Sequence, residues 1–146
     1  MLGQIEGRAS QRVVIADMEA GAGTLTRLPE GSLDVALLVV EPSAKSIDVA
    51  RRAQAIIAER QIGLSLIVAN RVRDDDDLVL VSSSFPGVDV VAIVEDPTVT
   101  RSDREARSPI DVDPDSPAVL AVAQLAARLG RWGLPVDAQR LLPVVE

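Results

Sequence analysis

The chain of 146 residues contains no cysteine and no histidine. These absences exclude disulfides, zinc sites with sulfur or imidazole ligands, and catalysis by a cysteine or histidine triad. Carboxylates remain as metal ligands, and they favour hard cations such as Mg²⁺. Aromatic residues are almost missing as well, with only Phe85 and Trp132, so the core must be built from aliphatic side chains. Lys45 is the only lysine, which leaves one candidate for any mechanism that needs one.

Basic side chains are outnumbered, with 15 lysines and arginines against 22 aspartates and glutamates and a net charge of −7. This balance speaks against a nucleic-acid or anionic-membrane surface as the main partner. No apolar run reaches the length of a membrane span, and the first residues lack the core of a signal peptide. We therefore expect one cytoplasmic domain, residues 1–146, that binds neither nucleic acid nor membrane.

Four short runs rich in β-branched residues predict strands at 13–16, 35–40, 64–69 and 88–94. Each run is nearly continuous in apolar residues rather than alternating, which is typical of parallel strands buried on both faces. Apolar residues at helical spacing predict helices over 46–60 and 117–129, the latter with Ser116 as N-cap, Pro117 at its first position and Gly130 as its stop. The stretch 74–85 favours a short helix, since a crossover is needed there, and a last helix is expected near Pro135. These elements predict an α/β fold with a mainly parallel sheet and covering helices.

Three polar segments follow predicted strands and could carry chemistry. Asp17 to Gly21 places a carboxylate and a glycine where open α/β sheets bind ligands. Asn70 has an amide whose donor and acceptor match the N6/N7 edge of adenine. Glu95, Asp96 and Pro97 open a mixed-charge stretch. Each segment also has an ordinary structural interpretation: a tight turn, a turn cap and a solvated helix start, respectively.

Taken in order, these segments resemble a known family. The run Val13-Val14-Ile15-Ala16-Asp17-Met18-Glu19-Ala20-Gly21 is similar to the Walker B and switch II segment of carbon monoxide dehydrogenase accessory ATPases, which belong to the MinD/ParA-like group of deviant P-loop ATPases. The similarity continues through Val39-Val40-Glu41-Pro42-Ser43, Val68-Ala69-Asn70-Arg71, Asp96-Pro97, Arg101-Ser102-Asp103-Arg104 and Ser108-Pro109, and covers about residues 12 to 130.

The resemblance implies a role for each matching position. Asp17 would orient Mg²⁺-bound water, and Gly21 would sense the terminal phosphate. Asn70 would read the adenine, and the loop of Asp96 and Pro97 would close over the base or ribose. The fold implied is a partial P-loop NTPase, Rossmann-like, with the chain corresponding to the C-terminal half of such a domain.

The printed sequence departs from that family in one decisive respect, because no G-x-x-x-x-G-K-[ST] motif occurs in it. Without the loop amides, lysine and hydroxyl of that motif, nothing holds the β- and γ-phosphates or the magnesium. Phosphoryl transfer depends on that positioning, so we expect no ATP hydrolysis by this chain alone. ATP or ADP with magnesium would bind fully only if a P-loop half were supplied.

Three hypotheses remain open at this point. The chain is a non-catalytic binding or regulatory module with a residual nucleotide site, half of a split ATP-binding protein completed by a P-loop partner, or an oligomerisation domain without a ligand. In the resembled fold, the strand before the P-loop lies inside the sheet. Its absence would expose backbone groups and apolar strand faces, which favours a homo-oligomer or a P-loop-bearing partner.

Overall fold

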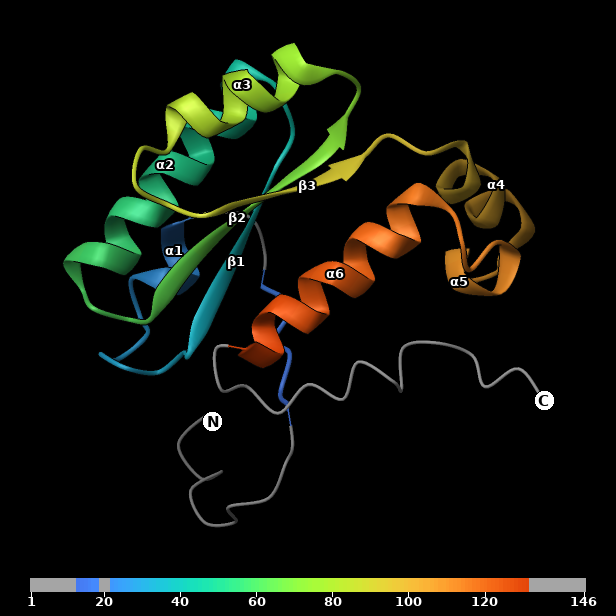
Figure 1. The fold of residues 1–146 in the computed structure, drawn as a ribbon. Helices are drawn as coiled ribbons and strands as arrows, with labels where there is room; N and C mark the ends of the chain where they lie inside the picture. The colour runs from blue at the N-terminus through green and yellow to red at the C-terminus, as the bar shows by residue number, and fades with distance from the viewer. Residues whose placement is uncertain (1–12, 19–21, 132–146) are drawn as a thin grey trace.

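The computed structural model describes residues 13–18 and 22–131, and it confirms the α/β fold class (Figure 1). The helices are α1 (Ala22–Leu25), α2 (Ala44–Glu59), α3 (Asp75–Ser84), α4 (Pro97–Glu105), α5 (Pro109–Val112) and α6 (Pro117–Arg131). The strands are β1 (Val35–Val40), β2 (Leu64–Val72) and β3 (Val90–Val94).

The strands form one parallel sheet in the order β1-β2-β3. Val35 lies opposite Leu64 at the start of β1, and Ile67 lies opposite Val90 at the start of β3. Because α2 and α3 connect successive parallel strands, the chain returns each time to the same end of the sheet before starting the next strand. All three strands therefore end at the same edge, where ligands bind in open α/β sheets.

Helices cover the two faces of the sheet in different ways. On one face, Val40, Ile67 and Phe85 lie in a core cluster with α2 and α3 residues, including the fully buried Val81. On the other face, Leu125 of α6 packs against Leu66 and Val68 of β2, and Leu129 extends this contact. Figure 1 shows α2 and α3 on the opposite side of the sheet from α6.

On the α6 face of the sheet, the described residues leave much of β1 uncovered. Leu37 and Val39 point to that face, but their side chains remain 41% and 62% exposed. Their register partners on β2, Leu66 and Val68, are 0% and 2% exposed beneath α6. α6 thus covers β2 and β3, and it does not cover Leu37 and Val39 of β1.

Helices α2 and α3 begin at side-chain caps. Ser43 accepts a hydrogen bond from the backbone N–H of Ser46, and Asp74 accepts one from that of Asp77. Such caps satisfy backbone donors that the first helical turn leaves unpaired. The helix predicted over 74–85 is therefore confirmed, because Asp74 and the carboxylates of the first turn compensate for the weak helix propensity of its serines.

The strand predicted at 13–16 is wrong, since residues 13–18 have no regular secondary structure. Val14 and Ile15 are exposed, although their composition is that of a buried strand. A parallel strand needs a neighbour for its backbone groups, and the described sheet ends at β1. Met18, by contrast, packs against the cluster of Leu25, Ala36, Ile57 and Ile62.

The other predicted elements agree with the structure apart from their ends. β2 runs three residues beyond the predicted strand, and α6 extends past Gly130, the predicted stop. The helix expected near Pro135 lies outside the described residues. Within the described ranges, no helix combines the length and apolar character needed to cross a membrane.

Candidate functional site

The carboxyl ends of the three strands bring together polar residues from separate parts of the chain. Glu41 follows β1, Asn70 and Arg71 lie near the end of β2, and Glu95 follows β3. Arg71 joins them: its guanidinium lies 3.4 Å from the carboxylate of Glu41 and 3.8 Å from that of Glu95. These exposed pairs contribute little to stability, but they align three loops at one edge.

The backbone of β2 is irregular at this edge. The register between β2 and β3 shifts between Asn70 and Val72, and Arg71 has a left-handed backbone with φ of 58°. A non-glycine residue in that conformation costs on the order of 1 kcal/mol or more. Bulges of this kind redirect side chains near binding sites, and here the bulge directs Arg71 between two acidic neighbours.

Asn70 is half-buried and lies opposite Ile93 of β3. Among the described residues, no hydrogen bond is formed by its side-chain amide, so it does not cap the turn that follows. The amide therefore retains a donor and an acceptor at the ligand-binding edge of the sheet. Asn70 is also the only asparagine in the chain.

Asp96 joins two helices at their N-termini. Its Oδ1 accepts a hydrogen bond of 2.8 Å from the backbone N–H of Thr98 in α4, and its Oδ2 accepts one of 3.0 Å from that of Ala118 in α6. The residue is 8% exposed. The bond from Ala118, followed by that from Thr98, holds the pKa of the Asp96 carboxyl below its usual range.

This double cap changes the interpretation of two sequence features. Ser116 was expected to cap α6, but among the described residues its side chain forms no hydrogen bond to the first turn of that helix, and Asp96 supplies the side-chain bond instead. Both oxygens of Asp96 are engaged with backbone N–H groups, so its carboxylate positions the loop that contains Pro97. A contact between that loop and a base or ribose remains a prediction.

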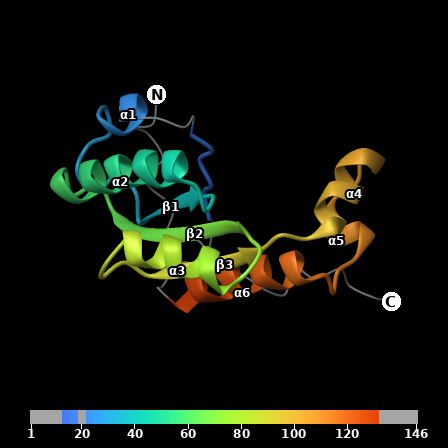
Figure 2. The same ribbon diagram turned by 90° about the horizontal axis from the view of Figure 1, so that it is seen from above.

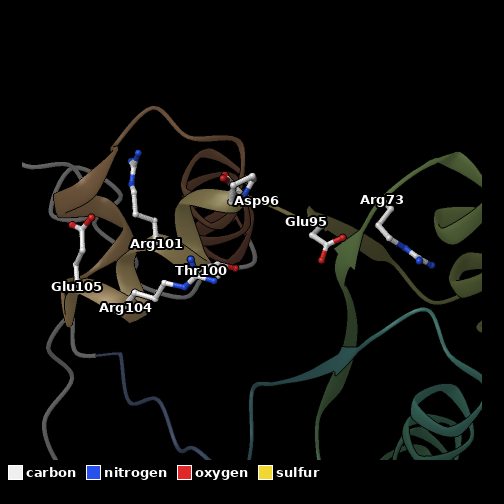
Figure 3. A pocket seen from close by; sticks show the side chains of 8 residues that line it. Arg73, Glu95, Asp96, Thr100, Arg101, Arg104 and Glu105 are labelled. Carbon is white, nitrogen blue, oxygen red and sulfur yellow. The ribbon is translucent and has the colours of Figure 1, made fainter.

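A hollow of about 660 Å³ lies beside this loop (Figure 3). Residues from the strand ends and from α4 line it: Arg73, Glu95, Asp96, Pro97, Thr100, Arg101, Arg104 and Glu105. Figure 3 shows Arg73 and Glu95 on the sheet side, with the α4 side chains across from them. Figure 2 shows that α4 and α5 lie beyond the end of the sheet, away from α2 and α3.

Arg73 is fixed at the edge of this hollow by Asp77. Its Nε lies 2.9 Å and its Nη2 3.0 Å from the two carboxylate oxygens, and its backbone N–H also donates to Oδ2. The side-chain bond from Arg73, followed by the backbone bond, lowers the pKa of Asp77, and the same pair raises the pKa of Arg73. The bidentate geometry orients the guanidinium plane.

Asp17 is not joined to this group of residues. It lies in the exposed stretch before Met18, and no described hydrogen bond or ion pair connects it to Asn70 or Asp96. Within the part of the chain that the structure describes, no cluster of three acidic side chains could hold a metal ion. Gly21 lies outside the described residues. The magnesium role of Asp17 and the phosphate role of Gly21 therefore remain predictions.

Neither Arg71 nor Arg73 was predicted as a site residue, although both lie at this edge. An arginine after a strand is a common surface residue, and nothing in the sequence signals the bulge that turns Arg71 between Glu41 and Glu95. For Arg73, the sequence does contain an indication of its ion pair, because Asp77 follows it by four residues, the spacing of ion pairs in helices.

Together these features define a parallel α/β sheet with a half-buried asparagine near its ligand-binding edge, a loop fixed by two helix caps, and a hollow lined by three arginines and three acidic residues. The chain is similar to two proteins of Methanocaldococcus jannaschii. It is 31% identical over 122 residues to the uncharacterized ATP-binding protein MJ0547, covering 80% of this chain and 46% of the relative. It is 36% identical over 64 residues to the uncharacterized ATP-binding protein MJ0823, covering 44% and 25%. The chain thus spans less than half the length of these relatives, and no protein-family model matches it.

Proposed function

We propose that this chain is a nucleotide-binding module that supplies the base-binding side of an ATP or ADP site. The single observation that carries the proposal is the half-buried Asn70, which lies two residues before the end of β2 and whose side-chain amide has no hydrogen-bond partner among the described residues. An amide in that state can pair with the N6/N7 edge of adenine. The similarity to a protein named as ATP-binding, over 80% of the chain, supports the same nucleotide.

In this proposal, residues around Asn70 define the site. The Pro97 loop closes over the base, because the two hydrogen bonds to Asp96 keep it beside the end of β3. Arg71 and Glu41 keep the β1 side of the site in place. The relationship to MinD/ParA-like and carbon monoxide dehydrogenase accessory ATPases, and the correspondence to one half of their domain, belong to the proposal.

The module does not hydrolyse ATP by itself. The printed sequence has no phosphate-binding loop of the P-loop type, and no described acidic cluster would hold Mg²⁺ against the phosphates. Since phosphoryl transfer relies on those groups, binding by this chain alone depends on the base rather than on the phosphates. Adenosine and ATP should consequently bind with similar, weak affinity, with a Kd on the order of 1 mM.

Selective ¹⁵N labelling provides a direct test, because ¹⁵N-asparagine labels only Asn70. Titration with adenosine should shift its side-chain amide signals saturably, and ATP should do so at similar concentrations. Cytidine presents a different hydrogen-bonding edge and should leave them in place. As a control, Gln124→Ala removes an exposed side-chain amide on α6, and this variant should bind adenosine as the native chain does. Unshifted Asn70 signals at saturating adenosine would contradict the proposal.

A second candidate function is favoured by the open side of β1. Strands with this composition are normally interior, so the chain could equally serve as one part of a split ATP-binding protein completed by a P-loop partner, with homo-oligomerisation as the remaining alternative. Sedimentation or light scattering of the purified chain separates these, since a homo-oligomer forms without any added polypeptide.

A further inference from the structure

One wall of the hollow beside the Pro97 loop is a single face of α4. Pro97, Thr100, Arg101 and Arg104 line the hollow, and they follow one another at spacings of three and four residues, which places them on the same side of a helix. Ser102, on the other side of α4, is fully buried. The packed side of the helix therefore holds the exposed side, with its two arginines, beside the hollow.

The two arginines of this face keep their hydrogen-bond donors free. Among residues 13–18 and 22–131, neither Arg101 nor Arg104 forms an ion pair, and neither side chain forms a hydrogen bond. Arg73, on the opposite wall, differs from them because Asp77 neutralises its charge through a bidentate pair. A guanidinium stays charged at any ordinary pH, so Arg101 and Arg104 remain as two cations without a described counter-ion.

The three carboxylates of the lining are engaged by groups outside the hollow. Glu95 lies 3.8 Å from Arg71, and Glu105 lies 3.4 Å from Arg107. Both oxygens of Asp96 accept hydrogen bonds from backbone N–H groups at the starts of α4 and α6. The lining contains equal numbers of arginines and acids, but these partners leave an excess of positive charge on the α4 wall.

The donors on this wall match a phosphomonoester. Such a group carries a charge of about −1.5 to −2 near neutral pH and presents three terminal oxygens. Arg101, Arg104 and the hydroxyl of Thr100 are three donor side chains on one helix face, and Figure 3 shows Arg104 beside Thr100. A carboxylate has one charge and two oxygens, so it would leave part of this set unused. The volume of about 660 Å³ also leaves room for the molecule that carries the phosphate.

We infer that the hollow binds a small phosphorylated molecule, whose phosphate is held by Arg101, Arg104 and Thr100. Asn70 is not among the lining residues, so this ligand is a second molecule, distinct from the nucleotide proposed at Asn70. Arg73, whose guanidinium plane is fixed by Asp77, offers a polar group on the opposite wall to the rest of the ligand. The inference goes beyond the proposed function and uses different side chains.

Labelling the full chain with ¹⁵N-arginine allows the site to be observed directly. Inorganic phosphate and glycerol 3-phosphate should each shift the Nε–H signals of Arg101 and Arg104 saturably, with a Kd on the order of 1 mM. Arg101→Gln and Arg104→Gln each remove one signal, which assigns it, and should weaken binding at the other arginine by at least about fivefold. Arg51→Gln is the matched control, because Arg51 is an exposed arginine of α2 without a described ion pair. It should change the affinity by less than about twofold.

Three results would overturn the inference. Sodium acetate at the same ionic strength should leave the two signals in place, and equal shifts with acetate would show only a general response to anions. An equal loss of affinity in Arg51→Gln and Arg101→Gln would assign the effect to net charge. Adenosine 5′-monophosphate should shift Asn70 as adenosine does and the arginines as glycerol 3-phosphate does. A single transition at both places, about tenfold tighter, would show that one nucleotide spans them.

The proposed function can fail without affecting this test. Unshifted Asn70 signals in adenosine would remove the base site and leave the arginine titration unchanged. Unshifted Arg101 and Arg104 signals in phosphate and in glycerol 3-phosphate would remove the phosphate site and leave the adenosine titration unchanged.

Discussion

β1 and β2 are neighbouring parallel strands built from the same aliphatic residues, and they differ in what surrounds them. β2 pairs on both edges and is buried on both faces, with Leu66, Ile67 and Ala69 fully buried. Among the described residues, β1 pairs on one edge only, and its α6 face is largely uncovered. The comparison shows that composition specifies an interior strand in both cases, while the described chain supplies the interior environment to only one of them.

The largest difference should appear on truncating two side chains that lie opposite each other. Leu66→Ala should lower the free energy of unfolding by about 3–4 kcal/mol, because it leaves a cavity between β2 and α6. Leu37→Ala should lower it by less than about 1 kcal/mol, because that side chain already contacts solvent. Urea unfolding followed by circular dichroism measures both values. Equal losses would mean that something covers β1 in solution.

The helix that covers β2, α6, is capped at its N-terminus by Asp96. Asp96→Ala removes hydrogen bonds to the N-termini of α4 and α6, so we expect a loss of about 2–3 kcal/mol in unfolding free energy. Asp103→Ala provides a matched control, since Asp103 is an exposed aspartate of α4 whose carboxylate makes no described hydrogen bond. It should change stability by less than about 0.5 kcal/mol. Similar effects from the two substitutions would refute the double cap.

The start of the β1–β2 pair should tolerate little added volume. A Cβ on Gly63 would lie 2.4 Å from the carbonyl oxygen of Leu33, so Gly63→Ala must push the two chain segments apart. We expect a loss of about 2 kcal/mol, within the range for overpacked sites. Gly23→Ala is the control, because a Cβ there meets no atom within 4 Å. Thermal unfolding measures both variants, and equal melting temperatures for them would contradict the expected strain at Gly63.

Much of this comparison could be predicted from the sequence, because local patterns carry it. The runs at 35–40 and 64–69 form strands, the run at 88–94 does so from Val90 onward, and α3 begins after its cap at Asp74 despite the serines that follow. The run at 13–16 has the same pattern and failed, since strand formation depends on a neighbour that a local pattern cannot reveal.

The site was only partly predictable for the same reason. The position of Asn70 at the end of a parallel strand follows from local pattern and topology. The bond from Ala118 to Asp96 spans 22 residues, and the left-handed backbone of Arg71 is set by a bulge between two strands. Neither feature has a local sequence signature, because each depends on tertiary packing.

Acid should weaken the attachment of α6, because its first turn is bound by the carboxylate of Asp96. The pKa of the Asp96 carboxyl is lowered in the folded chain, so the unfolded chain binds a proton at higher pH than the folded chain does. The resulting stability is present above the usual aspartate pKa of about 3.9 and is lost as the pH falls through the lower folded value. Asp96→Asn removes the titrating carboxyl and should flatten this part of the stability curve. Urea unfolding of the native chain and of this variant between about pH 2 and about pH 6 measures both curves, and parallel curves would contradict the assignment.

The smallest expected effect comes from replacing one methyl group with a hydroxyl at two matched positions of the sheet. Val39 and Val68 are register partners on the same face, one exposed and one beneath α6. Val68→Thr buries a hydroxyl without a partner and should lower the free energy of unfolding by about 1–2 kcal/mol. Val39→Thr exposes its hydroxyl to water and should change it by less than about 0.5 kcal/mol. Urea unfolding of both variants measures the two losses, and equal losses would mean that Val39 is covered in solution as Val68 is.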